Sequence, residues 1–315
     1  MIFTLTVIAV LIAFAFGVGG YTFFAACRRG KELDWLDEAA VKKSDFGPYY
    51  ANIKHGHQWL LEHKARDLYM TSHDGLCLHA TWVPAENAKG TVMLVHGYHS
   101  CALTDFSIAF ERYHQRGMNI LLPSQRAHGK SEGKYSTFGV LESRDVLDWI
   151  QFHNEKFAAF PMMLSGMSMG AATVMYVAGE ELPENVRAIN ADCGFTSPKE
   201  IIAKVFKDAT HVPAWPFIWA TDLFARFFGG FSLEEKVSTE TLKKNTRPIS
   251  FVHGRDDDFV PCDMTCRSFE ACAGEKALLL VDGATHGTSF LHDKEHYLQQ
   301  IEWLMCDGLG LDRQR

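Results

Sequence analysis

The sequence predicts an α/β domain built on one mostly parallel sheet, and three observations support this prediction. From about residue 65 onward, short apolar runs alternate with helix-like segments, which is the pattern of an α/β sheet. The chain has 315 residues, 47% hydrophobic and 22% charged, which is enough to bury one substantial core. The sequence shows no repeat at a period of about 20–50 residues, so a repeat architecture is excluded.

Eight segments have the composition of β-strands. The first two flank the turn residues 73–75 (HDG), which predicts an antiparallel hairpin. The later segments are separated by helical stretches, and such crossover connections require parallel neighbours. The expected strands read RDLYMTS, LCLHATWVP, TVMLVHG, NILLPS, PMMLSG, RAINADC, PISFVHG and ALLLVDG. The expected helices read CALTDFSIAFERYHQRG, LESRDVLDWIQFHNEK, AATVMYVAGEEL and KEHYLQQIEWLMC.

The N-terminal segment differs in composition from the rest. Residues 1–27 contain no Lys, Arg, Asp, Glu or His, and this run exceeds the roughly 20 residues that cross a bilayer. The basic stretch RRGK follows at once, so the positive-inside rule places the bulk of the chain in the cytoplasm. We therefore expect a single-pass cell-membrane anchor over 1–27, a lead-in segment over 28–64 and a folded domain over 65–315.

A processed, exported form is the alternative to this anchor. The stretch FFAAC resembles a lipoprotein cleavage site ending at Cys27, although Phe24 fits that pattern poorly. A cleaved signal peptide would also carry positive charge before its apolar run, and this sequence has none there. The uncleaved anchor is the preferred interpretation.

Charge and cysteine content argue against other classes of protein. The net charge of −7 provides no basic surface of the kind that binds nucleic acid. The 8 cysteines are scattered, without a C-x-x-C pair or histidines at zinc-finger spacing, so we expect free thiols. Free thiols in a reducing compartment agree with a cytoplasmic domain.

Two stretches fit the pattern G-x-S-x-G, which presents a nucleophilic serine in one large class of hydrolases. They are GKSEG, with Ser131, and GMSMG, with Ser168. GMSMG directly follows an expected strand and leads directly into an expected helix, which is the context that the motif needs. GKSEG starts several residues after its strand and leads into no helix. Ser168 is therefore the predicted nucleophile, and Ser131 is predicted to be a loop residue.

A nucleophilic serine needs a base to take its proton and a carboxylate to orient that base. The strand PISFVHG ends in RDDDFVP, which offers Asp256, Asp257 and Asp258. The next strand ends in ATHGTSF, which offers His286. Functional groups of open parallel sheets gather at the carboxyl ends of the strands, so we expect these side chains and Ser168 at the same edge.

Together these stretches make the chain resemble a serine hydrolase of the α/β-hydrolase fold, from about Asp67 to Leu311. The resemblance is to a bacterial subgroup with one N-terminal membrane segment, and it rests on LVHGYHS, RAHGKSEG, GMSMG, HGRDDDFVP and ATHG. It implies an eight-stranded, mostly parallel sheet with flanking helices and a small helical cap. The family pattern H-G-x-x-D-x-x-V-P selects Asp257 among the three acids.

The resemblance also assigns the remaining parts of the site. The catalytic set would be Ser168, Asp257 and His286, and the backbone N–H groups of Tyr98 and Met169 would form the oxyanion hole. The stretch RAHGKSEG corresponds to a structural loop of the family, in which Ala127 replaces the usual glycine. The chemistry requires no cofactor and no metal ion.

Three further histidines near the expected rim, His96, His99 and His128, have the residue type of metal ligands. No acidic residue stands at a spacing that would complete a metal site. We expect His96 to brace the oxyanion loop and the other two histidines to line it.

A segment at about 198–245 interrupts the alternation of strands and helices and is rich in large apolar residues. We expect it to form a helical cap over the catalytic rim. Trp215, Trp219 and Phe227 are expected to line an acyl-binding pocket there, and helices that merely pack on the sheet are the alternative. Such a wall beside a membrane anchor would also touch the bilayer.

The sequence thus predicts a serine hydrolase that cleaves small-molecule carboxylic esters, with acyl esters and thioesters included, through an acyl-enzyme. Two alternatives stay open. A serine peptidase or amidase on the same fold would need a site for a peptide amine, and the chain offers little room for one. A membrane-tethered, non-catalytic binding protein with a vestigial triad is the other. The natural substrate is not defined, because pocket shape sets it.

Overall fold

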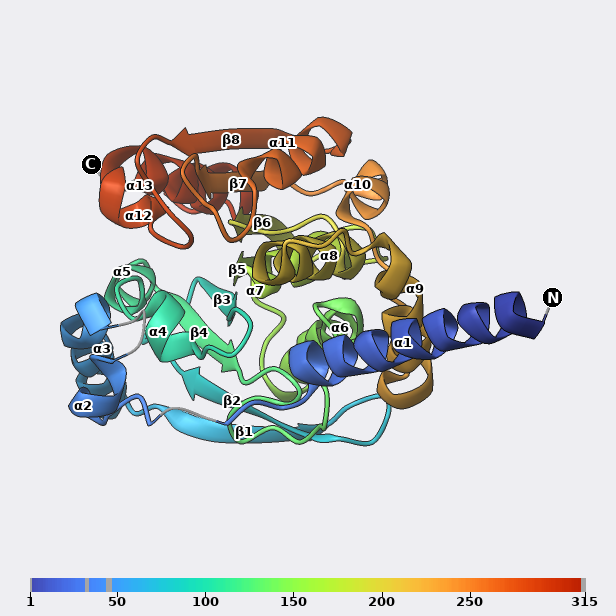
Figure 1. Cartoon of the computed structure of the whole chain (residues 1–315). Helices are drawn as coiled ribbons and strands as arrows, with labels where there is room; N and C mark the ends of the chain where they lie inside the picture. Colours follow the sequence, from blue (N-terminus) through green and yellow to red (C-terminus); the bar gives the residue numbers. More distant parts are fainter. Residues whose placement is uncertain (1, 32–33, 44–46, 313–315) are drawn as a thin grey trace.

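The computed structural model describes residues 2–31, 34–43 and 47–312, and its centre is an eight-stranded sheet (Figure 1). The strand order is β1-β2-β4-β3-β5-β6-β7-β8. β2 pairs antiparallel with β1 and with β4, and the other neighbours are parallel. The strands are β1 (Arg66–Thr71), β2 (Cys77–Val83), β3 (Gly90–Val95), β4 (Met118–Pro123), β5 (Met162–Met167), β6 (Val186–Asp192), β7 (Ile249–Gly254) and β8 (Lys276–Val281). The predicted fold class, including the hairpin, is confirmed.

Helices cover both faces of the sheet. The central strands β3, β4 and β7 are buried along their whole length, as expected for strands that lie between two helical layers. One face packs against α6 (Val140–Lys156), α7 (Met169–Val177) and α11 (Cys262–Ala271). The other face packs against α3 (Tyr50–Glu62), α4 (Ala102–Phe106), α5 (Phe110–Gln115), α13 (Lys294–Trp303) and the π-helix η4 (Leu304–Gly308). The short α12 (Ser289–His292) precedes α13.

The prediction of a single helix over CALTDFSIAFERYHQRG is wrong in one respect, because the structure divides this stretch into α4 and α5. The two helices are separated by a turn at residues 107–109. At this turn Ser107 lies against Gly56 of α3, where an added Cβ would stand only 2.4 Å from the Ser107 Cβ. The break therefore lies where α3 packs closely against the domain.

The lead-in segment is part of the folded body. It contains α2 (Glu38–Val41), the 3-10 helix η1 (Gly47–Tyr49) and α3. On α3, Trp59 is buried, stacks on His63 and packs against Phe110 of α5. Helix α3 was not predicted, because most of its large apolar residues stand together at 59–61 instead of recurring at helical spacing.

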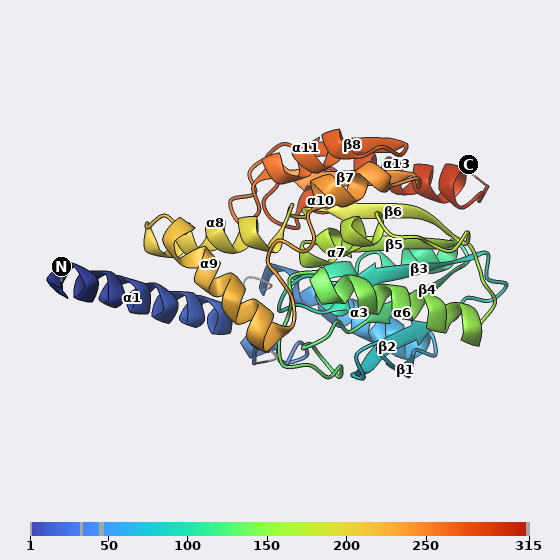
Figure 2. The same cartoon turned by 90° about the vertical axis from the view of Figure 1, so that its right-hand side faces the viewer.

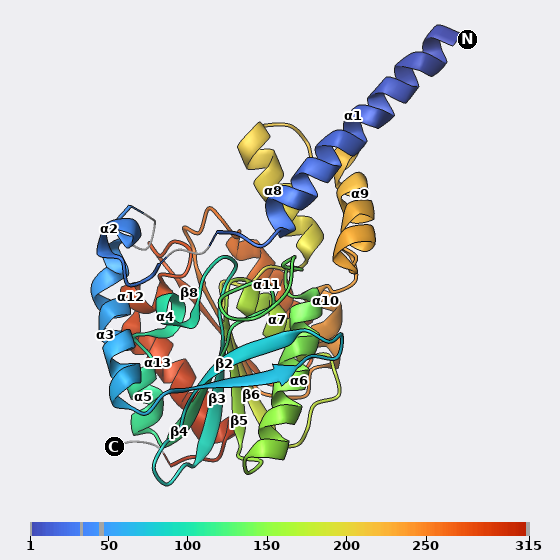
Figure 3. The same cartoon turned by 90° about the horizontal axis from the view of Figure 1, so that it is seen from below.

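The helix α1 (Ile2–Cys27) is long and apolar enough to cross a membrane by length and composition. Its N-terminal half projects from the body, and its C-terminal half lies in the angle between α8 (Pro198–Thr210) and α9 (Trp215–Phe224) (Figures 2 and 3). Gly19 and Gly20 allow close packing on α9, since added Cβ atoms would stand 2.5 Å from Ala220 and 2.8 Å from Phe224. The C-terminal half of α1 is thus fixed to the domain.

The expected cap occupies the connection between β6 and β7. It consists of α8, α9, the π-helix η2 (Ala225–Gly229), α10 (Ser238–Thr241) and the 3-10 helix η3 (Leu242–Lys244). Helices α8 and α9 run in opposite directions and diverge at an angle beyond the carboxyl ends of the strands, and α1 lies beside them (Figure 2). The cap and α1 together therefore stand over the edge of the sheet where the predicted site lies.

Candidate active site

Ser168 occupies a sharp turn between β5 and α7. Its backbone angles are φ 55° and ψ −116°, a conformation that costs energy in a residue other than glycine. The turn also requires glycine on both sides, because a Cβ at Gly166 would stand 2.1 Å from the Gly170 oxygen and one at Gly170 would stand 1.9 Å from the Val95 oxygen. The Ser168 N–H donates to the Asp192 carbonyl at 2.8 Å, which holds the turn to β6. The pattern G-x-S-x-G is thus a steric requirement at this position.

Ser131 is a structural residue of a buried loop. Its Oγ accepts the His79 N–H at 2.8 Å and donates to the Ser124 carbonyl at 2.5 Å. These bonds connect the loop to β2 and to the end of β4. The hydroxyl therefore acts as donor and as acceptor in holding the loop, as expected if GKSEG is a structural loop.

Replacing Ser131 by alanine is expected to lower the free energy of unfolding by about 1–3 kcal/mol, because a buried N–H and a carbonyl lose their partner. Denaturant unfolding of the detergent-solubilised protein measures this loss. The folded variant should keep its turnover of a p-nitrophenyl ester within about threefold. A loss of turnover by orders of magnitude, in a variant that remains folded, would contradict the structural role.

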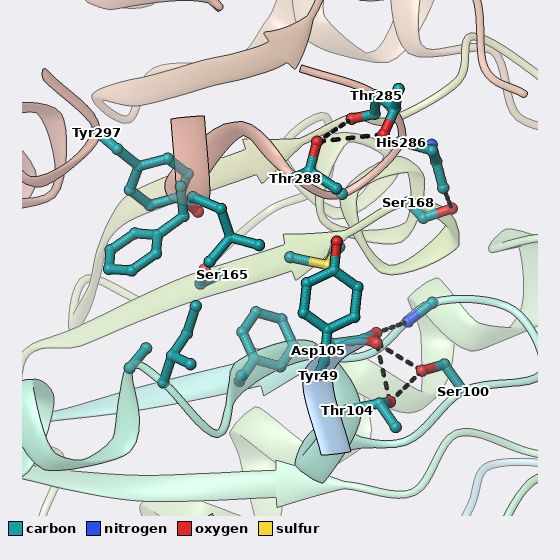
Figure 4. A pocket seen from close by; sticks show the side chains of 18 of the residues that line it. Tyr49, Ser100, Thr104, Asp105, Ser165, Ser168, Thr285, His286, Thr288 and Tyr297 are labelled. Carbon is teal, nitrogen blue, oxygen red and sulfur yellow. Dashed lines mark hydrogen bonds between the residues drawn. The ribbon is translucent and has the colours of Figure 1, made fainter. Parts of the chain in front are cut away.

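His286 lies between Ser168 and Asp257 and makes a hydrogen bond to each (Figure 4 shows the first pair). The Ser168 Oγ and the His286 Nε2 are 2.9 Å apart. The His286 Nδ1 and the Asp257 Oδ2 are 2.7 Å apart. The Ser168 hydroxyl can donate to Nε2 when Nδ1–H donates to the carboxylate, which is the tautomer that a general base requires. The structure therefore brings these three predicted residues together in hydrogen-bonding order.

The Asp257 carboxylate is fully enclosed and accepts several hydrogen bonds. His253 Nε2–H reaches Oδ2 at 3.0 Å, and the Phe259 and Val260 N–H groups reach Oδ1 at 3.0 and 2.8 Å. Burial acts to raise the pKa of Asp257, but the hydrogen bonds from His253 and His286 outweigh it and hold the pKa well below its usual range. Asp257 therefore stays ionised beside His286 at neutral pH.

The neighbouring acids differ from Asp257 in position. Asp256 and Asp258 are exposed, whereas the Asp257 side chain is completely buried. His253 is a residue of the site that the sequence did not single out for a role of its own. It is buried at the end of β7 and bonds Asp257 on one ring nitrogen and Thr265 on the other, at 2.6 Å. The H-G-x-x-D pattern, whose histidine is His253, could have indicated this residue from the sequence.

The two chain segments expected to form the oxyanion hole lie next to Ser168. Met169 is the first residue of α7, so its N–H has no acceptor within the helix. The segment that carries Tyr98 passes close to the serine, since a Cβ at Gly97 would stand 3.3 Å from the Ser168 Cβ. The Asp105 carboxylate accepts the Gly97 N–H at 2.7 Å, which fixes this segment.

The three histidines near the rim are held by backbone groups. His96 Nδ1–H donates to the Gly97 carbonyl at 2.8 Å, and Nε2 accepts the Gln125 N–H at 3.0 Å. Burial lowers the pKa of His96 to about 4, so the ring is neutral, as this bonding pattern requires. His128 Nδ1–H donates to the Arg126 carbonyl, and Nε2 accepts the His99 N–H at 3.0 Å. His96 and His128 therefore link the segment 96–99 to the loop after β4.

Two groups of side chains in the described part of the chain have the spacing of metal ligands. The first consists of Cys193, Asp257 and His286, and the second consists of His73, Asp145 and Asp148. In the first group Asp257 and His286 bond each other, and burial raises the pKa of the Cys193 thiol well above its usual value. In the second group Asp145 pairs with Arg126 and Asp148 pairs with His73. Each group is thus accounted for by hydrogen bonds and ion pairs within the protein.

Ser168 borders two cavities. The first has a volume of about 700 Å³ and contains the polar groups Asp105, Arg112, Ser165 and Tyr297 as well as apolar side chains (Figure 4). The second has a volume of about 790 Å³, lies between α1 and α8, and has an almost entirely apolar lining. A carbonyl group at Ser168 would therefore lie between an almost entirely apolar cavity and a second cavity that also offers several polar groups.

The prediction that Trp215, Trp219 and Phe227 line an acyl pocket needs correction. None of the three lines either cavity, and their side chains are 77%, 42% and 82% exposed. Trp219 instead packs edge-to-face on Phe16 of α1. The apolar cavity is lined from the cap mainly by α8, and from the other side by α1. The physical reason is that α9, which carries Trp215 and Trp219, and η2, which carries Phe227, present these rings outward and not into the cavities.

Comparisons with known proteins agree with this fold. Residues 86–242 match a family model described as serine aminopeptidase, S33. The uncharacterized protein YqkD of Bacillus subtilis is 26% identical over 221 residues, which cover 70% of this chain and 72% of that protein. The uncharacterized membrane protein YNL320W of Saccharomyces cerevisiae is 24% identical over 240 residues, which cover 72% of this chain and 75% of that protein.

Solved structures give the same assignment. The Pyrococcus furiosus esterase Pf2001 superposes with a TM-score of 0.65 at 21% identity, covering 79% of this chain and 95% of that one. A puromycin-hydrolyzing peptidase of Mycobacterium tuberculosis superposes with a TM-score of 0.58 at 19% identity, covering 79% of this chain and 40% of that one. The chain therefore has the α/β-hydrolase fold. Its core carries the sequence pattern of a hydrolase family, and it resembles both esterases and peptidases.

Proposed function

We propose that this protein is a serine hydrolase that cleaves carboxylic esters through an acyl-enzyme intermediate. The observation that carries the proposal is the hydrogen-bonded series Ser168, His286 and Asp257 at a turn whose strained backbone exposes the serine to two cavities. A turn that served packing alone would not need a strained serine aligned with a histidine and a buried carboxylate.

The geometry supports the following reaction. His286 Nε2 takes the proton of Ser168 as Oγ attacks the ester carbonyl, and the imidazolium then protonates the departing alcohol. Asp257 keeps Nδ1–H directed toward itself and stabilises the charged ring. Water, deprotonated by the same nitrogen, releases the acyl group from Ser168. The N–H groups of Tyr98 and Met169 would stabilise the oxyanion in both steps.

The protein is proposed to be anchored in the cell membrane by α1, with the catalytic domain in the cytoplasm. Only 11% of the 18-residue apolar stretch within α1 is buried, so this helix is not a core helix of the domain. The basic stretch RRGK follows it and favours the cytoplasmic side for the domain. A yeast relative is also described as a membrane protein.

A serine peptidase or amidase is the second candidate, because the matching family model is described as serine aminopeptidase. An aminopeptidase needs acceptors for the free ammonium group of its substrate. Asp105 lines the first cavity, but its oxygens already bind the Gly97 N–H, Ser100 and Thr104. Among the described lining residues, this leaves only Asp258 as a free carboxylate. The lining therefore favours an ester substrate.

A panel of p-nitrophenyl esters and aminoacyl p-nitroanilides separates the two candidates. We expect kcat/KM for the best ester to exceed that for the best anilide by roughly 100-fold or more, because a site without paired carboxylates gives the ammonium group no binding energy. The Ser168→Ala variant serves as the background control for both substrate classes. Preferred cleavage of anilides would overturn the ester proposal in favour of the peptidase.

A further inference from the structure

The membrane helix forms one wall of the apolar cavity that Ser168 borders. Six side chains of α8 and one of α9 form the facing wall, and Tyr98, Phe138, Phe195 and Phe259 close the inner end. The positions contributed by α1 are Phe14, Gly17, Val18, Tyr21, Thr22, Ala25 and Ala26. Most of the cavity's length therefore runs along α1, and the reacting hydroxyl lies at its inner end.

The lining residues of α1 follow helical periodicity. Phe14, Gly17, Val18, Tyr21 and Ala25 recur at spacings of three and four, so they share one face of the helix. At 1.5 Å per residue, the stretch from Phe14 to Ala25 spans about 16 Å. This length, and the absence of charged residues from the described lining, suit an extended alkyl chain.

The inner half of α1 is bonded to the catalytic machinery. The Tyr98 hydroxyl donates to the Ala26 carbonyl at 2.6 Å, which connects the helix to the segment 96–99 beside Ser168. Arg29, which lies two residues after the end of α1, donates to the Ser131 carbonyl at 2.7 Å. Phe23 of α1 is completely buried. The wall is thus held in place by direct contacts with the domain.

The outer surface around this cavity is apolar. Trp215 and Phe227 of the cap are 77% and 82% exposed, and Tyr21 on the lining face of α1 is 76% exposed. If α1 spans the bilayer, these exposed side chains meet the acyl region of the leaflet on the domain side. The cavity between α1 and α8 would then open toward lipid.

We infer that the substrate is a single-chain fatty acyl ester that enters from the bilayer along α1, with its chain held between α1 and α8. Its polar alcohol occupies the other cavity, among Asp105, Arg112 and Tyr297. This inference rests on the proposed function, because the ester carbonyl must lie at Ser168. The anchor is accordingly a part of the substrate pocket.

Photocrosslinking locates the chain directly. The full-length protein in lipid nanodiscs is treated with an alkyl fluorophosphonate whose chain ends in a diazirine, then irradiated and analysed by peptide mass spectrometry. We expect phosphonate on Ser168 and crosslinks on residues 14–22 of α1 or on Val205 and Phe206 of α8. Crosslinks confined to Phe290, Leu291 and Leu298 of the other cavity would overturn the inference. Failure of the phosphonate to modify Ser168 would instead contradict the proposed function.

A substitution on α1 tests the same inference through selectivity. Gly17 lines the cavity and has open space where a Cβ would stand, so Gly17→Leu adds bulk to the cavity without a backbone clash. Each buried methylene contributes roughly fourfold to kcat/KM, and displacing two or three of them should lower the dodecanoyl-to-acetyl ratio by more than about tenfold. Esters are used below their micellar concentration.

Ala13→Leu is the matched control, because Ala13 is exposed on α1 and does not line the cavity. Its dodecanoyl-to-acetyl ratio should equal that of the wild type. An unchanged ratio in Gly17→Leu, with hydrolysis that still depends on Ser168, would overturn the inference and leave the proposed function standing.

Discussion

Replacing Ser168 by alanine is expected to lower kcat for ester hydrolysis by roughly 10⁴- to 10⁶-fold and to abolish labelling by a fluorophosphonate probe. The variant loses the atom that attacks the carbonyl, while the oxyanion donors and both cavities remain. Turnover of a p-nitrophenyl ester and in-gel fluorescence of the labelled protein measure the two effects.

Ser131→Ala is the matched control for this experiment, since it removes the same atom from the second G-x-S-x-G stretch. Its label should persist at wild-type intensity. Labelling that survives in Ser168→Ala and disappears in Ser131→Ala would refute the assignment. A wild-type protein that hydrolyses no ester and takes no label would favour the non-catalytic alternative.

Replacing Asp257 by asparagine is expected to lower kcat by about 10⁴-fold with little change in KM. An asparagine amide can donate to His286 Nδ1, and the ring would then carry its proton on Nε2, where it cannot accept the serine proton. The ionised Asp257, which its hydrogen bonds stabilise, would no longer balance the imidazolium. Steady-state kinetics with a soluble ester measure the loss.

Asp256→Asn controls for the change of a carboxylate to an amide in the same loop, because Asp256 is exposed and its side chain lies outside both cavities. This variant should keep wild-type kcat. Circular dichroism verifies that both variants fold. A loss below about tenfold in a folded Asp257→Asn protein would show that the histidine is not oriented by this carboxylate.

The choice between the two serines could be made from the sequence because it depends on local context. The strand ends at Met167 and the helix begins at Met169, so Ser168 must form a sharp turn between them. The structure shows why residues larger than glycine are excluded at positions 166 and 170. The strand positions were equally predictable from the sequence, since buried parallel strands are continuous apolar runs. The residues alone left three acids open at 256–258. The family pattern selected Asp257, and the structure shows it as the only buried one of the three.

The lining of the apolar cavity could not be predicted in the same way. Helix α9 is apolar around most of its circumference, so its sequence does not indicate which rings face a cavity and which face outward. Trp215 of α9 and Phe227 of the following η2 were assigned inward and lie outward. For α1, an anchor is expected from hydropathy alone, and its packing against the cap depends on long-range contacts. The adjacent glycines Gly19 and Gly20 were the available sign of close helix packing.

The most direct test of the account is to trap the acyl-enzyme. The protein is mixed with a ¹³C-labelled acyl ester, quenched in acid within milliseconds, digested and analysed by mass spectrometry. The account predicts an added acyl mass on the hydroxyl of Ser168, which decays as water releases the labelled acid. An acyl group on another side chain, or product formed at full rate without any acylated peptide, would contradict it.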